Sequence, residues 1–170
     1  LLADSPLAEA VYALYGPEAE KPLAPLTNRD PGKLTVAALT GVTALVRATA
    51  HTMEQRGVTY PAKNIGDILR NADITHISNE VPFAVDCPYP NPVQEEMRFC
   101  SRDNYIQLLE DIETDVVELT GDHFSDWGTD AMFHTLDMYR EHDWPVYGGG
   151  ENLAEGRKAL LLENHGNRIA

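Results

Sequence analysis

The chain has 170 residues, of which 43% are hydrophobic, and its formal net charge at pH 7 is -14. This length and hydrophobic content suffice for one domain with a substantial core, and they exclude a disordered chain. Only 13 lysines and arginines are present against 27 acidic residues, so we expect no nucleic-acid partner. No run of 18 apolar residues occurs, and we therefore predict no transmembrane segment in this chain.

The first 32 residues read differently from the rest. A short helical pattern, Leu7 to Tyr15, precedes a segment rich in proline that is typical of a linker. We therefore expect an N-terminal helical segment and linker over 1–32 and one domain over 33–170. The chain begins without Met and ends where the pattern of a further strand begins, so we expect a fragment or an excised domain.

From Lys33 onward, patterns typical of strands alternate with patterns typical of helices. Strands are predicted at 33–39, 73–78, 115–119 and 146–147, and helices at 44–53, 61–71, 101–112 and 129–143. Ser101 is the predicted N-cap of its helix, and a hairpin is predicted over 159–170 with its turn at Gly166. This alternation predicts an α/β fold, a mainly parallel sheet with helices on its faces.

A long irregular loop is predicted between the second strand and the third helix. The segment 81–99 contains four prolines, and Cys87 and Cys100 flank its proline-rich part. A disulfide between them would close a loop of about 14 residues and contribute ~3 kcal/mol in the chain-entropy model. Two free thiols are the alternative, because a count of two cysteines does not decide between them.

The ends of three predicted strands converge in this architecture. They are Gly41-Val42-Thr43, Ser78-Asn79-Glu80 and Gly121-Asp122-His123. Carboxyl ends of parallel strands meet at one edge of a sheet, where ligands bind. Glu80, Asp122 and His123 would supply two carboxylates and an imidazole, a ligand set that suits Zn, Mn or Fe. A solvated Glu and a turn Asp beside a surface His are the alternatives.

Several neighbours are candidates for supporting roles. Asp126 could orient the imidazole of His123, or it could N-cap the helix that begins at Thr129. His123 itself could be a metal ligand or a general acid, which makes His123 and Asp126 the candidate catalytic pair. Trp127 could form an aromatic wall of the site or pack at the helix entry, and Asn79 is a second candidate for substrate binding.

Three stretches resemble the motifs of one family. Residues 116–128, VVELTGDHFSDWG, are similar to the pattern D-V-V-x-L-A-N-N-H-x-x-D-x-G. Residues 135–136 and 148–153 resemble T-L followed by G-x-G-x-N-L, and residues 164–170 resemble E-x-N-G-x-K-I-A. These motifs resemble the CapA family, capsule and poly-γ-glutamate synthesis proteins with a calcineurin-like metallophosphoesterase fold. The resemblance extends from Leu34 to the end of the chain.

The resemblance implies a fold, a location and a site. The fold would be a metallophosphoesterase-like sandwich, incomplete in this chain, which would hold the N-terminal part of the domain. The protein would be extracytoplasmic and associated with the cell envelope, with its signal or anchor outside this chain. Its partners would be an anionic polymer or phosphoryl substrate and other membrane subunits of polyglutamate synthesis. Glu80, Asp122 and His123 would bind a divalent metal, supported by Asp126.

Three positions depart from the family motifs. Gly41-Val42 stands where the family has Gly-Asp, Ser78 replaces an Asn, and Asp122 replaces the second Asn of Asn-Asn-His. Because Val cannot ligate a metal, these departures weigh against a dinuclear site. The sequence therefore supports two hypotheses: a metal-dependent hydrolase or transferase of the phosphoesterase type, or a non-catalytic envelope protein for polymer export or anchoring that retains the fold with a degenerate metal site.

Overall fold

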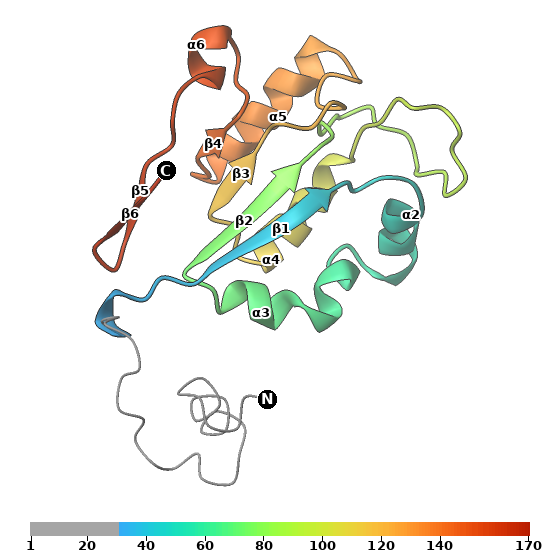
Figure 1. The fold of residues 1–170 in the computed structure, drawn as a ribbon. Coiled ribbons are helices and arrows are strands. Elements are labelled where there is room, and N and C mark those ends of the chain that lie inside the picture. Colours follow the sequence, from blue (N-terminus) through green and yellow to red (C-terminus); the bar gives the residue numbers. More distant parts are fainter. Residues whose placement is uncertain (1–30) are drawn as a thin grey trace, which may run out of the picture. The chain divides into compact units, whose positions relative to one another are not determined.

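Four parallel strands form the central sheet, in the order β1-β2-β3-β4 (Figure 1). They are β1 (Ala37–Thr43), β2 (Ile74–Asn79), β3 (Val116–Glu118) and β4 (Val146–Tyr147). The computed structural model describes residues 31–170, and residues 35–170 form one compact unit within it. The helical pattern predicted at residues 7–15 lies outside the described residues.

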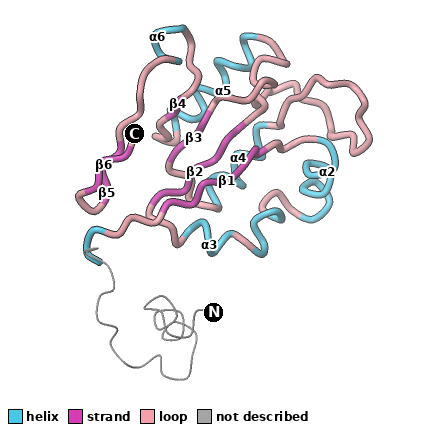
Figure 2. Tube along the Cα trace, in the orientation of Figure 1, coloured by secondary structure: helices cyan, strands magenta, loops and turns pink. Residues whose placement is uncertain are grey.

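Helical segments connect the strands, as the ribbon and the tube both show (Figures 1 and 2). Their bounds are η1 (Pro31–Lys33), α2 (Arg47–Arg56), η2 (Tyr60–Asn64), α3 (Gly66–Arg70), η3 (Asp103–Tyr105), α4 (Ile106–Asp111), α5 (Thr129–Glu141) and α6 (Leu153–Gly156). An antiparallel hairpin of β5 (Leu162–Asn164) and β6 (Asn167–Ile169) follows. The predicted α/β class is confirmed, since a parallel sheet is flanked by helices, consistent with an incomplete metallophosphoesterase-like fold.

The two faces of the sheet have different neighbours. Ile77 of β2 and Val117 of β3 are register partners, and both belong to the buried core that α2, α3, α4 and α5 build with them. Side chains alternate along a strand, so His76 and Val116 point to the opposite face. There they line a cavity of about 330 Å³ together with residues of the β5–β6 hairpin. All six residues of β2 are buried, as expected of a strand covered on both faces.

Several predicted elements lie at shifted positions. β1 begins at Ala37, later than predicted, and continues to Thr43, beyond the predicted end at Leu39, with a register irregularity between Leu39 and Val42. The helix predicted at 61–71 is divided into η2 and α3. The predicted cap at Ser101 is wrong, because its hydroxyl donates to the carbonyl of Leu45 at 3.1 Å, a partner 56 residues away in the sequence. Long-range packing decides that position, not the local capping preference.

The proline-rich loop is closed twice at its base. Cys87 and Cys100 form a disulfide, with their Cα atoms 5.8 Å apart. Just outside it, the amide of Ala84 donates to the carbonyl of Ser101 at 2.9 Å, and the amide of Ser101 donates to Pro82 at 2.8 Å. The two ends of the loop are therefore held side by side, and this fixes where the irregular backbone leaves the domain and returns to it.

We predict that replacing both cysteines by serine lowers the free energy of unfolding by ~3 kcal/mol, because the loop-closure entropy of the unfolded chain is restored. Urea unfolding of the oxidised chain and of the double variant measures the difference. Reductant should bring the native chain to the stability of the variant and leave the variant unchanged. A native chain whose stability does not respond to reductant would contradict the prediction.

Candidate metal site

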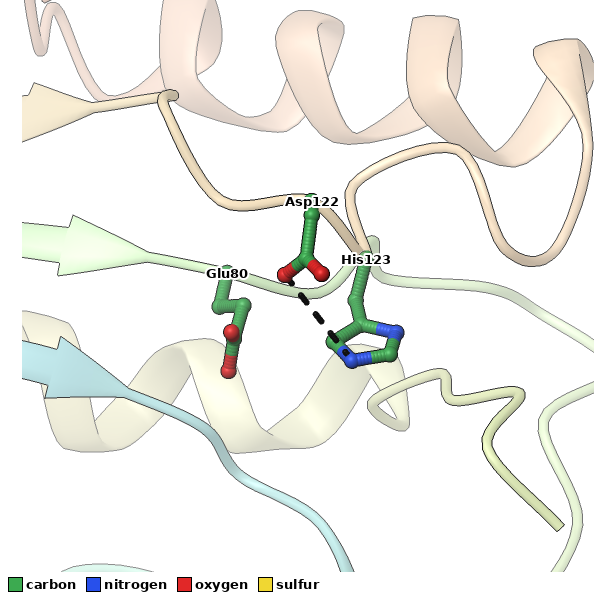
Figure 3. A group of neighbouring side chains, drawn as sticks. All are labelled: Glu80, Asp122 and His123. Carbon is green, nitrogen blue, oxygen red and sulfur yellow. Dashed lines mark ion pairs between the residues drawn. The ribbon is translucent and has the colours of Figure 1, made fainter.

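Three chemically suited side chains meet at the carboxyl ends of β2 and β3 (Figure 3). Glu80 directly follows β2, and Asp122 and His123 follow β3 within a few residues. One ligand atom from each of the three lies within 4.8 Å of the other two. In the part of the chain that the structure describes, no other trio of His, Cys, Asp and Glu meets this condition.

Close approach of the two strand ends depends on Gly121. A Cβ atom at this position would lie 2.5 Å from the Cα of Glu80 and 2.8 Å from its Cγ. Such distances are well inside van der Waals contact, and one of the two atoms is backbone that cannot rotate away. Glycine is therefore required here if Glu80 is to stand beside Asp122 and His123.

The imidazole of His123 is held from two sides. Its Nδ1 lies 2.7 Å from Oδ2 of Asp126, and its ring packs edge-on against Phe99 with the centroids 4.8 Å apart. When Nδ1–H donates to the carboxylate, Nε2 carries the free lone pair. This Nε2 lies 3.9 Å from Oδ1 of Asp122 and faces the carboxylates in Figure 3. A carboxylate behind a histidine is the usual arrangement around metal-ligating imidazoles.

Asp126 contacts the site instead of capping the following helix. Besides His123, its Oδ2 accepts a hydrogen bond from the backbone amide of Phe99 at 2.9 Å. The N-cap of α5 is Gly128, and no side chain caps that helix. Of the two interpretations of Asp126, the geometry matches the one in which the carboxylate orients the imidazole.

The group fits a divalent cation in both charge and number of ligands. Two carboxylates and a neutral imidazole would balance a dication. Ligands at about 2.1 Å in tetrahedral geometry lie roughly 3.4 Å from one another, so the side chains must draw together slightly from their present separation. Asp122 can supply this movement, because its side chain is 85% exposed. Three protein ligands leave a fourth position for water or substrate, as in catalytic zinc sites.

The structure places the two predicted substrate-binding residues differently. Asn79 is completely buried, and its amide donates to the carbonyl of Val81 and to the hydroxyl of Tyr139. Burial raises the pKa of Tyr139 well above its usual value, so this hydroxyl stays neutral. Asn79 thus ties the end of β2 to α5. Trp127 is partly exposed and donates its Nε1–H to Asp86 at 2.9 Å.

The first strand contributes no ligand. Glu80, Asp122 and His123 are called the metal group below. Val42 is the register partner of Ser78, so it lies at the same edge of the sheet as the metal group, with 63% of its surface exposed. The residue that the family motif would make a carboxylate is therefore an exposed apolar side chain. The group of Glu80, Asp122 and His123 is consistent with one metal ion.

Some residues around the group carry no recognisable signal in the sequence. Phe99, which packs against His123, also lies under the guanidinium of Arg47, whose central carbon is 4.6 Å from the ring centroid. Arg98 donates its Nε–H to the carbonyl of Asp126 at 2.9 Å. Folding of the disulfide-bonded loop brings Phe99 and Arg98 to the site and to Arg47 on α2. No spacing in the sequence predicts these contacts.

Comparison with known proteins identifies the family. The family described as "Bacterial capsule synthesis protein PGA_cap" matches residues 25–170, which include the whole metal group. The chain belongs to this family. It is also 21% identical over 149 residues to the capsule biosynthesis protein CapA of Bacillus anthracis. That match covers 87% of this chain and 36% of the relative, so the chain spans just over a third of the relative's length.

The family match confirms the resemblance drawn from the motifs of residues 116–128 and of the glycine-rich segment after β4. None of the helices in residues 31–170 combines the length and apolar character needed to cross a membrane.

We predict that Gly121→Ala lowers the free energy of unfolding by about 1–3 kcal/mol, since the added methyl overpacks against the backbone of Glu80. It should also weaken divalent-metal binding, because Glu80 must move away. Gly41→Ala is the matched control at the end of β1, where a Cβ meets nothing within 4 Å. Thermal unfolding and metal titration of both variants measure the effects, and equal behaviour of the two would contradict the role of Gly121.

Proposed function

We propose that this chain forms the metal-binding part of a hydrolase or transferase of the phosphoesterase type that acts in capsule or poly-γ-glutamate synthesis. The convergence of Glu80, Asp122 and His123 at the ends of two parallel strands carries the proposal. Membership in the capsule synthesis family supplies the biological setting. When bound, a divalent metal supplies a Lewis acid for a phosphoryl or acyl oxygen and lowers the pKa of a water.

His123 is held by Asp126, whereas the side chain of Asp122 is largely exposed. Asp126 fixes the tautomer and the orientation of His123, so that Nε2 faces the carboxylates. From there Nε2 would bind the metal or, when protonated, act as a general acid. Asp122 lies on the solvent side, where a substrate would enter. Trp127 is the proposed aromatic surface for the substrate, which would be an anionic polymer or a phosphoryl compound.

The disulfide supports an extracytoplasmic location. Disulfides persist in oxidising compartments and are rare in the cytosol, and here the bond holds the loop that packs against His123. The proposed location is the cell envelope. Other membrane subunits of polyglutamate synthesis are the proposed partners, in keeping with the capsule family.

The proposed metal site predicts a graded response to substitution. The full chain should bind Mn²⁺ or Zn²⁺ with one ion per molecule in calorimetric titration. Asp126→Asn should lower the affinity roughly 10- to 100-fold, because it removes the charged acceptor behind the imidazole. His123→Ala should lower the affinity further, because it removes a ligand.

The control for this series is His134→Ala. Like His123, His134 stands beside an aspartate, with its Nε2 3.0 Å from Asp103, but it lies outside the metal group. The His134→Ala variant should bind metal with the same affinity as the native chain. Phosphomonoester hydrolysis by the full-length protein should follow the same order. Absence of both bound metal and phosphatase activity would reject the proposal.

The alternative is a non-catalytic envelope protein for polymer export or anchoring, and the exposed Val42 is the observation that favours it. In this case the metal group would be a remnant of the fold. Polymer production by cells carrying His123→Ala separates the hypotheses, since an unchanged yield would favour the non-catalytic role.

Val42→Asp tests the degenerate position directly. A carboxylate at the end of β1 should raise Mn²⁺ affinity roughly tenfold or more, because affinity grows with the number of charged ligands. Val85→Asp is the control, because Val85 is 82% exposed on the loop and an aspartate there adds the same charge at another place. Equal affinities for the two variants would show that β1 does not reach the metal group.

A further inference from the structure

We propose that a second pocket, between α2 and the disulfide-bonded loop, binds an oxyanion through the guanidinium groups of Arg47 and Arg98. The cavity has a volume of about 310 Å³, and Phe99, Trp127 and Tyr89 contribute aromatic walls. This size suits a carboxylate or phosphate group together with part of the molecule that carries it. The proposal goes beyond the proposed function, because it requires no metal.

Arg47 has no strong acceptor for its guanidinium group. One terminal nitrogen donates to the sulfur of Met97 at 3.1 Å, a weak acceptor, and the Nε is buried without any hydrogen-bond partner. Among the described residues, no carboxylate oxygen lies within 4.0 Å of this side chain. A buried charged donor without an acceptor is unfavourable unless a ligand supplies one.

The backbone at Arg47 is also unusual. Its φ is 49°, a left-handed conformation that residues other than glycine rarely adopt. This residue begins α2, and the conformation separates the extended segment after β1 from the helix. Conformations of this kind persist at ligand sites, where the surrounding structure holds them.

Arg98 enters the same pocket from the loop. Its guanidinium carbon lies 4.5 Å from the ring centroid of Trp127, and its Nε donates to the carbonyl of Asp126. Stacking and this hydrogen bond fix the plane of the group and leave its terminal nitrogens without a carboxylate partner in the described chain. A fixed guanidinium plane suits bidentate binding of a carboxylate or phosphate.

Several other arginines in the described chain have carboxylate partners, and Arg56 and Arg157, which form no ion pair among the described residues, do not line this pocket. Arg70, Arg102 and Arg140 each form an ion pair with at least one carboxylate. In a chain with 27 acidic residues, two arginines that share one pocket without an acidic partner stand out.

Acidic groups around the pocket do not cancel its positive charge. Arg102 also lines it but is neutralised by Glu54 at 2.6 Å. Glu96 is the one acidic residue in the pocket lining, against the two unpaired arginines Arg47 and Arg98. Asp86 accepts a hydrogen bond from the indole of Trp127 and is not part of the pocket lining. The balance within the lining remains positive, so an anion is the expected ligand.

The pocket adjoins the metal group without merging with it. The ring of Phe99 contacts Arg47 and His123, and Asp126 holds Arg98 by its carbonyl and His123 by its carboxylate. A substrate with two anionic groups would then place one near the metal group and the second in the pocket that Arg47 and Arg98 line.

The test measures anion binding to the full chain by calorimetry, in EDTA and at low ionic strength, with inorganic phosphate and with pentaglutamate as separate probes. The native chain should bind at least one of them saturably. Arg47→Gln and Arg98→Gln should each weaken that binding about tenfold or more, as expected for loss of a charge-assisted hydrogen bond. Fluorescence of Trp127, in a Trp144→Phe background, should change on binding.

Arg56→Gln is the matched control. It lies on the same helix, and its guanidinium stacks over an aromatic ring, that of Tyr60, at 5.0 Å. The Arg56→Gln variant should bind phosphate and pentaglutamate with the same affinity as the native chain. Arg98 is exposed, so Arg98→Gln keeps the test valid if Arg47→Gln does not fold, which circular dichroism reports.

Each outcome decides the matter. Binding of phosphate alone would assign the pocket to phosphoryl groups, and binding of pentaglutamate would assign it to carboxylates. No saturable binding of either probe, or equal weakening by Arg56→Gln, would overturn the proposal. Because EDTA removes metal, this result is independent of whether the metal group binds an ion.

Discussion

The candidate site depends on the register between β2 and β3. Ser78 pairs with Glu118, and this pairing sets Glu80 beside Gly121 just beyond the strands. The same register points Ile77 and Val117 into the helix-covered core. A slip of β3 by one residue would turn Val117 to the other face, at a cost of about 1.5–3 kcal/mol for the buried side chain that is lost. Packing of the core therefore fixes the position of the strand ends that carry the candidate ligands.

Asp126 extends this fixed frame to the proline-rich loop. Its carboxylate accepts hydrogen bonds from the imidazole of His123 and from the amide of Phe99, so one side chain joins the β3–α5 turn to the loop. The disulfide and the prolines limit the conformations of the loop before it packs. The loop consequently contributes a wall of the site in spite of having no regular secondary structure.

The sequence predicts the order of strands and helices and the meeting of two strand ends, because both follow from local patterns. Glu80 and Asp122-His123 come directly after apolar runs, and parallel strands align their carboxyl ends. The turn of the β5–β6 hairpin is equally local, since His165 and Gly166 both adopt the positive φ of a tight turn.

What the sequence does not predict depends on contacts between distant segments. Asn79 reads as a strand-end polar residue, yet Tyr139 from a helix 60 residues later buries it. Ser101 reads as a cap, yet its hydroxyl bonds to the segment before α2. Phe99 and Arg47 meet only because a disulfide-bonded loop folds back onto α2. Local preference gives way in each case to packing.

Phe99 contacts one residue of each of the two candidate sites. Glu80 and Asp122 are candidate ligands of a cation, and Arg47 is a cation without an acidic partner among the described residues. A direct ion pair between them would occupy the metal ligands and the guanidinium together. Phe99 contacts the guanidinium of Arg47 and the imidazole of His123, and the hydrogen bond from its amide to Asp126 holds it in place.

The net charge of -14 adds a condition on any anionic ligand. Repulsion from the acidic surface is screened beyond about 8 Å at physiological ionic strength, whereas contacts inside a half-buried pocket are screened much less. An anion is therefore held only where cationic groups are presented locally without acidic partners. In the described chain, Arg47 and Arg98 at the edge of the metal group meet this condition. Each guanidinium stacks on an aromatic ring, Phe99 and Trp127 respectively, which has no charge to neutralise it.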